Sequence, residues 1–326
     1  MSAENIVRFL HSRFAAVLIG MAAIACTCVS YAVGDVIPIT GSKGLGFPSA
    51  NSWLPPCVAS LVLNLILCTG IALLMIILNK RFNLTHSTSV LISGLFLIMQ
   101  AALPSVAGQF YGGTLLCVIV MTGAGILFTT FHNPEATKPV FLIFFLLSLC
   151  AFTQYAYVMF IPVFVIGCAQ MRILNGRSVT AAILGIITPV WILAGFGLIQ
   201  FSDIAVPEFT DIFTAVRDRE ILQMSVTTGV TLLLCVITGA GCMLRTYNYN
   251  SNGRSFNGFI YVVSIATIIL IFVDYTNVVT YMPLLNCCTA YHTSHFFAIH
   301  ARRLSYIGIL TVLAVYAGLY TWSILL

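Results

Sequence analysis

Long apolar runs separated by short polar segments fill nearly the whole chain. A membrane-spanning helix needs about 20 apolar residues to cross a hydrocarbon core of about 30 Å. The apolar runs therefore predict an all-α fold, a polytopic membrane helix bundle of about 11 transmembrane helices. These helices are expected to form a single transmembrane domain over residues 1–326. The expected spans are 14–34, 54–79, 87–106, 110–131, 139–153, 155–171, 178–200, 222–244, 256–273, 279–299 and 304–326.

The stretch 139–171 decides whether the chain crosses the membrane an odd or an even number of times. One uninterrupted helix of this length would measure about 50 Å, too long for an ordinary span. Thr153-Gln154-Tyr155 is a polar break within it, so two short helices or a re-entrant pair are expected. Either arrangement brings the chain back to the side from which it entered.

The basic residues give the orientation. If 139–171 forms two short segments that return the chain to the same side, eleven Lys and Arg residues lie on the side of the N-terminus and three lie on the opposite side. This asymmetry is typical of cytoplasmic against outer loops, so the N-terminus is expected in the cytoplasm and the C-terminus outside. The eleven are Arg8, Arg13, Lys80, Arg81, Lys138, Arg172, Arg177, Arg245, Arg254, Arg302 and Arg303; the three are Lys43, Arg217 and Arg219.

The acidic residues show the reverse bias. Only Glu4 and Glu135 fall on the cytoplasmic side, and the other seven fall outside. Acidic residues contribute little to membrane topology, so insertion alone does not require this distribution. It directs the search for chemistry to the outer face. The outer acids are Asp35, Asp203, Glu208, Asp211, Asp218, Glu220 and Asp274.

Composition strengthens the membrane interpretation. The chain is 60% hydrophobic and 7% charged, with a mean hydropathy of +1.04. Soluble domains carry roughly 25% charged residues, so this chain has too little polar surface for a water-soluble globule. Membrane lipids are therefore expected partners. The net charge of +5 is interpreted by the side of the membrane on which each charged residue lies, and no nucleic-acid partner is expected.

The eleven cysteines indicate neither a disulfide framework nor a metal site. Most lie in apolar runs, where Cys behaves as a small hydrophobic residue. The pairs Cys26-x-Cys28 and Cys287-Cys288 lack the spacing of metal ligands, so no metal is expected. Whether the protein binds a cofactor stays unknown from the sequence.

An outer interfacial helix is expected near 207–219. Pro207 suits the first position of a helix, and the apolar residues after it recur at helical spacing. Such a helix would lie in the outer interface with Arg217 and Arg219 facing water, where they could contact a phosphate. The alternative is a plain connector with solvated charges. The apolar residues are Phe209, Ile212, Phe213 and Val216.

Few polar groups lie within the spans. Asp35 and Asp274 sit at the outer ends of the first and ninth spans, and no carboxylate lies at mid-membrane, which argues against an ion-coupled transporter. His292 and His295 share a face of the tenth span. They could bind a phosphate or relay protons, or they could make interhelical hydrogen bonds, as is expected of Asn64, Gln100 and Gln154.

Six segments carry a family resemblance: Asn79–Asn83, Leu103-Pro104, Phe141–Pro162, Arg172–Arg177, Ala182–Pro189 and Ser294–Ala298. Together they resemble an uncharacterised family of polytopic Bacteroidota inner-membrane proteins, over about two thirds of the chain. That resemblance implies a multi-pass protein of the bacterial inner (cytoplasmic) membrane.

The layout also resembles the GT-C type of polyprenyl-phosphate-sugar glycosyltransferase, which carries a catalytic carboxylate in its first outer loop. The resemblance implies Asp35 as base or metal ligand and Asp274 as a second catalytic carboxylate. Here the loop is short and has one acid rather than a pair. The expected function is cell-envelope biogenesis that handles a lipid-linked (polyprenyl-phosphate) substrate at the outer face, with Arg217, Arg219, His292 and His295 as substrate-binding residues. The alternatives are a non-catalytic subunit that scaffolds other membrane subunits, and a transporter or lipid flippase.

Overall fold

The computed structural model describes residues 13–33, 44–85, 91–199, 218–246, 250–299 and 302–325. Within these ranges the chain forms helices and no β-strand, which confirms the all-α fold for this part of the molecule. The long helices are α2 (Arg13–Val33), α3 (Val58–Phe82), α4 (Leu91–Ala101), α6 (Gly112–Phe128), α7 (Thr137–Ala151), α8 (Ala156–Gln170), α9 (Gly176–Gly195), α10 (Asp218–Thr246), α11 (Ser251–Val273), α12 (Val278–Ile299) and α13 (Arg302–Leu325). Short elements are η1 (Ala50–Ser52), α5 (Pro104–Ala107) and η4 (Tyr275–Asn277).

Five helical stretches of the described chain are long and apolar enough to cross a bilayer by themselves: Val58–Phe82, Gly176–Gly195, Ile221–Leu244, Ser251–Val273 and Ile307–Leu325. They keep large apolar side chains on the surface; Trp191 is 76% exposed and Leu244 is 79% exposed. Apolar surface of this kind requires a lipid environment. The chain is therefore a membrane protein.

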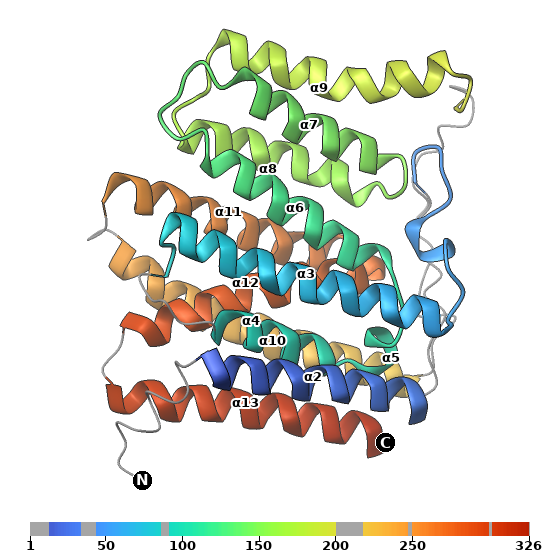
Figure 1. Cartoon of the computed structure of the whole chain (residues 1–326), viewed down its shortest axis with the longest axis vertical. Coiled ribbons are helices and arrows are strands. Elements are labelled where there is room, and N and C mark those ends of the chain that lie inside the picture. Colours follow the sequence, from blue (N-terminus) through green and yellow to red (C-terminus); the bar gives the residue numbers. More distant parts are fainter. Residues whose placement is uncertain are drawn as a thin grey trace.

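The helices lie side by side with roughly parallel axes, in a stack that has α9 and α7 at one end and α2 and α13 at the other (Figure 1). Some of the connections are short: four residues join α7 to α8 and five join α8 to α9. Consecutive long helices consequently run in opposite directions across the stack.

The expected span 87–106 is divided. α4 ends at Ala101 and the one-turn helix α5 begins at Pro104. A proline disfavours the helical conformation of the residue before it, so the helix stops short of Leu103. Pro104 itself occupies the first position of α5, where its missing N–H costs no hydrogen bond.

The polar break in 139–171 lies where the sequence places it. α7 ends at Ala151, α8 begins at Ala156, and the two helices pack against each other. The segment after residue 43 closes over this turn, because the backbone N–H of Phe47 donates to Phe152 O at 3.0 Å. A Cβ on Gly44 would lie 1.9 Å from the same oxygen, so only glycine fits there.

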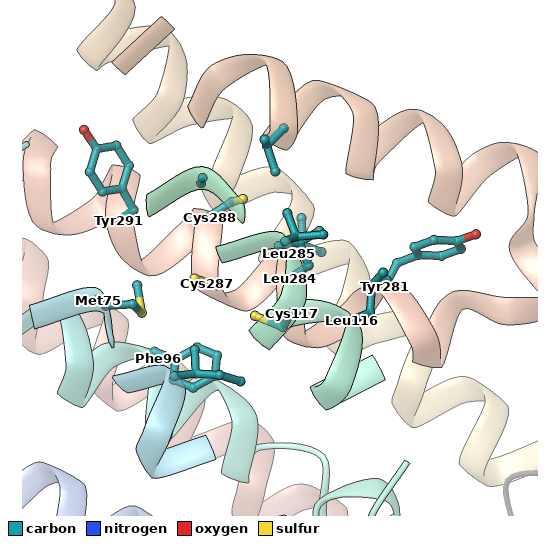
Figure 2. Close-up of a cluster of buried hydrophobic side chains, with 14 of the residues drawn as sticks. Met75, Phe96, Leu116, Cys117, Tyr281, Leu284, Leu285, Cys287, Cys288 and Tyr291 are labelled. Carbon is teal, nitrogen blue, oxygen red and sulfur yellow. The ribbon is translucent and has the colours of Figure 1, made fainter. Parts of the chain in front are cut away.

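Helix α12 is the buried centre of the bundle. Every residue from Val279 to His295 is buried. The helix packs against α4, α6, α10, α11 and α13. Figure 2 shows side chains of α12 beside those of α3, α4 and α6; the labelled residues are Met75, Phe96, Leu116, Cys117, Tyr281, Leu284, Leu285, Cys287, Cys288 and Tyr291.

Candidate functional site

A buried carboxylate at one end of the stack is the most polar feature of the described chain. Asp274 follows the last residue of α11 and is only 4% exposed. Its Oδ2 accepts hydrogen bonds from the hydroxyls of Tyr281, at 2.8 Å, and Tyr155; its Oδ1 accepts from Asn277 Nδ2 at 2.8 Å. Burying a carboxylate is costly unless hydrogen bonds compensate its charge, and these three donors supply that compensation. We call Asp274, Tyr155, Tyr281 and Asn277 the outer polar cluster, after the side on which the sequence leads us to expect Asp274.

Local structure supplies two of the three donors. The single turn η4 follows Asp274 directly and places Asn277 three residues on, while Tyr281 lies in the first turn of α12. Tyr155 comes from the turn between α7 and α8. Burial, reinforced by the Asp274 carboxylate, raises the pKa of Tyr155 well above its usual range. The phenol therefore stays neutral at physiological pH and remains a hydrogen-bond donor.

A second contact ties the same two turns together. Gln154 Nε2 donates to Thr280 Oγ1 at 2.9 Å, directly beside the outer polar cluster. A Cβ on Gly112 would lie 2.3 Å from Gln154 Oε1, so α6 must present glycine at this point. The α7–α8 turn is thus fixed to the start of α12 by adjacent residues, and the outer polar cluster is held from both sides.

A groove opens beside the outer polar cluster, between α10, α11 and the first turn of α12. It encloses about 1110 Å³ of empty space, part of which is open to the surroundings. Phe272 and Tyr275, which line the groove, flank Asp274 in the sequence. The lining residues are Met224, Ser225, Thr228, Gly229, Leu232, Ile271, Phe272, Tyr275, Val278 and Val279. The groove is thus lined largely by apolar side chains, and none of the four residues of the outer polar cluster lines it.

The histidine pair lies elsewhere, further along α12. His292 is 1% exposed, and its ring stacks on Tyr261 with centroids 4.8 Å apart. Ser264 Oγ donates its single hydrogen to Ile260 O, so the 2.8 Å contact between Ser264 Oγ and His292 Nε2 has the imidazole as donor. His292 Nδ1 is then a bare acceptor, and it has no hydrogen-bond partner among the described residues.

The His292–Ser264 bond joins α12 to α11, which is the interhelical alternative offered by the sequence. His295 is fully buried against the ring of Tyr291. His292 lies fourteen residues into α12 from Val278, about 21 Å along the helix axis. The histidines and the outer polar cluster are therefore two separate places. Within the described ranges, no group of three or more His, Cys, Asp or Glu side chains is placed to hold a metal ion.

The other polar residues singled out within spans make bonds between helices. Asn64 Nδ2 donates to Ala107 O at 2.8 Å. Gln100 Nε2 donates to Tyr111 Oη at 2.7 Å, and Gln100 Oε1 accepts from Asn286 Nδ2 at 2.9 Å. The expectation that such groups serve interhelical hydrogen bonding is confirmed for Asn64, Gln100 and Gln154.

The remaining expected site residues fall largely outside the described chain. Asp35, Arg217 and most of the expected interfacial helix 207–219 lie outside it. Arg219 is the second residue of α10, and its side chain is not described. Sequence reasoning named Asp274 but missed its partners. Asn277 and Tyr281, at i+3 and i+7, share a helical face with it and carry a detectable signal. Tyr155, 119 residues away, carries none.

Comparison with known proteins adds no relative: no protein-family model, curated protein or solved structure matches this chain.

Proposed function

We propose that this chain is a multi-pass protein of the bacterial inner membrane that handles a lipid-linked substrate of cell-envelope biogenesis at its outer face. One observation carries the proposal: the carboxylate of Asp274 is buried and accepts hydrogen bonds from three side chains at one end of a bundle of apolar helices. Ionisable groups at membrane depth are costly and mark functional sites. The groove between α10 and α11, lined largely by apolar side chains, suits the hydrocarbon part of such a substrate.

The helix directions support the proposed orientation. In the alternating stack, the ends where α3 meets α4, α6 meets α7, α8 meets α9 and α10 meets α11 lie on one side. The basic residues near these ends are Lys80, Arg81, Lys138, Arg172, Arg177, Arg245 and Arg254. Asp274 and the α7–α8 turn lie on the other side. The positive-inside rule then favours eleven crossings, a cytoplasmic N-terminus, and the outer polar cluster at the outer face.

Within this proposal Asp274 orients the phenol groups of Tyr155 and Tyr281, which donate hydrogen bonds to it. If the protein transfers a sugar, the acceptor hydroxyl must lose a proton as the bond to the sugar forms, and a carboxylate is a suitable base. Asp35 is the proposed base. Asp274 already accepts hydrogen bonds from three side chains, which suits it to holding the site in place.

The test replaces the chromosomal gene with four alleles: a deletion, Asp274→Asn, Asp35→Asn and Glu135→Gln. Glu135 is the matched control, because it is an exposed acid in the α6–α7 connection, on the opposite side of the stack. Lipid extracts are then analysed by mass spectrometry for polyprenyl-phosphate-linked intermediates, and the amount of protein in the membrane is measured in parallel.

The deletion and both aspartate variants should change the pool of these intermediates, while Glu135→Gln leaves it at the wild-type level. An unchanged pool in the deletion strain would refute the proposed function, whatever the variants do. A changed pool in the deletion with normal pools in both aspartate variants would place the function away from these carboxylates.

A further inference from the structure

We propose that residues 44–53 form a strap that controls access to the outer polar cluster and opens to admit the polar part of the substrate. Each of the four residues of the cluster is between 0% and 5% exposed, so a ligand reaches Asp274 only when a covering segment moves. The strap, in blue, runs along one end of the stack from α9 toward the start of α3 (Figure 1). This inference rests on the proposed function for what enters, whereas the opening itself is measurable without substrate.

The strap is fastened on both sides of Gln154, the residue beside the outer polar cluster. On one side the backbone N–H of Phe47 donates to Phe152 O at 3.0 Å, two positions before Gln154. On the other side Asn51 Oδ1 accepts from the backbone N–H of Gly112 at 2.7 Å. Gly112 is the residue whose Cβ would lie 2.3 Å from Gln154 Oε1. The strap therefore covers the turn that contributes to the outer polar cluster.

The strap is held more weakly than the helices that it covers. Two of its three backbone hydrogen bonds to the end of α7 and the following turn are 3.4 Å long, beyond the usual range for N–H···O bonds. Its side chain Phe47 packs on a small cluster, separate from the main core, that consists of Phe152, Leu193 and Ile199. Segments with few buried apolar contacts open at a lower free energy than the core of a fold. The strap can therefore open while the bundle stays folded.

Two glycines show how closely the strap is seated. A Cβ on Gly44 would lie 1.9 Å from Phe152 O, so alanine at this position must lift the strap from the turn. A Cβ on Gly46 would lie 3.1 and 3.2 Å from the two γ carbons of Ile199, so cysteines at these two positions stand close enough to form a disulfide. The strap can thus be forced open or locked shut by changes that leave the outer polar cluster intact.

The experiment measures how fast a water-soluble carbodiimide and glycine ethyl ester modify the carboxyl group of Asp274. It uses the purified full-length protein in lipid nanodiscs, and peptide mass spectrometry gives the rate at each carboxyl group. The variants are Gly44→Ala and the double variant Gly46→Cys/Ile199→Cys. The double variant is measured both oxidised and reduced, so that the same chain is compared with the strap locked and free.

Two controls separate the strap from general effects. Glu135 is an internal control, because it is an exposed acid on the opposite side of the stack and should react at one rate in every sample. Gly195→Ala is the matched control variant, because Gly195 lies two residues after Leu193 of the small cluster and has open space at its Cβ. The unfolding temperature of each variant is measured first.

In the wild type Asp274 should react slowly, during brief openings of the strap. Gly44→Ala should raise that rate roughly tenfold, as expected if the closed strap loses about 1.4 kcal/mol. In the double variant, oxidation should lower the rate at Asp274 by a similar factor, and reduction should restore it. Gly195→Ala should react as the wild type does.

Equal rates at Asp274 in the oxidised and reduced double variant would overturn the inference, because the outer polar cluster would then be reached without the strap. A double variant that forms no disulfide would overturn it too, since the strap would not lie against residue 199. If Gly44→Ala unfolds below the wild-type temperature, the double variant decides alone. No substrate is present, so these outcomes are separate from failure of the proposed function, which is decided by lipid-linked pools in the deletion strain.

Discussion

Two tyrosines near the α7–α8 turn provide a direct test of the outer polar cluster. Tyr155 and Tyr157 are 4% and 0% exposed, and they stand two residues apart. The hydroxyl of Tyr155 donates to the Asp274 carboxylate. The hydroxyl of Tyr157 has no hydrogen-bond partner among the described residues. The substitution Tyr→Phe removes the same single oxygen from each, so the structure predicts opposite signs.

The magnitudes follow from the hydrogen bonds. A hydrogen bond to a charged group contributes about 1.5–3 kcal/mol, so Tyr155→Phe should lower the free energy of unfolding by about 2 kcal/mol. A buried hydroxyl without a partner costs about 1–3 kcal/mol, so Tyr157→Phe should raise that free energy by about 1 kcal/mol. The two variants should therefore differ by about 3 kcal/mol, although their side chains differ from wild type by the same atom.

Unfolding by SDS in mixed micelles, followed by tryptophan fluorescence, measures these differences. Asp274→Asn combined with Tyr155→Phe completes a double-mutant cycle, and the coupling energy between the two residues should be of the order of 1–2 kcal/mol. Loss of stability in both phenylalanine variants, or a coupling energy near zero, would show that the outer polar cluster does not stabilise the fold in the way described.

Two further predictions concern helix packing and the buried imidazole. Gly185→Ala should lower the free energy of unfolding by about 1–3 kcal/mol, because its Cβ would lie 2.6 Å from a backbone oxygen of α7. Gly195→Ala, on the same helix with open space at its Cβ, should instead raise stability by about 0.5 kcal/mol, and thermal unfolding in detergent compares the two. His292→Leu should leave stability within about 1 kcal/mol of wild type, because Ser264 keeps its bond to Ile260 O and an unpartnered nitrogen disappears. A loss of several kcal/mol in an SDS titration would mean that His292 Nδ1 has a partner such as a buried water.

The helices could be predicted because each apolar run is long and locally bounded. The polar triplet at 153–155 marked the turn between α7 and α8 for the same reason. The division of 87–106 before Pro104 was missed, although proline restricts the residue before it. Asp274 could be placed at a helix end because it directly follows an apolar run.

The distant partner of Asp274, Tyr155, and the groove could not be predicted. Tyr155 reaches Asp274 only because the α7–α8 turn packs against the α11–α12 turn, and no local pattern encodes that contact. The groove depends on the distance between α10 and α11. The residue pattern of each helix, taken alone, does not give that distance. Gly229 looked like any other small residue in an apolar run.

The burial of α12 has a consequence for how the chain enters the membrane. This helix carries Asn286, His292, Thr293 and His295, and it is absent from the helical stretches apolar enough to span a bilayer by themselves. A segment that polar partitions poorly into bare lipid. Of the five helices packed against it, α4, α6, α10 and α11 precede it in the chain and α13 follows, so the ribosome delivers four of them first. We therefore expect α12 to leave the translocon into an already assembled protein surface, which makes its insertion depend on the success of every earlier step.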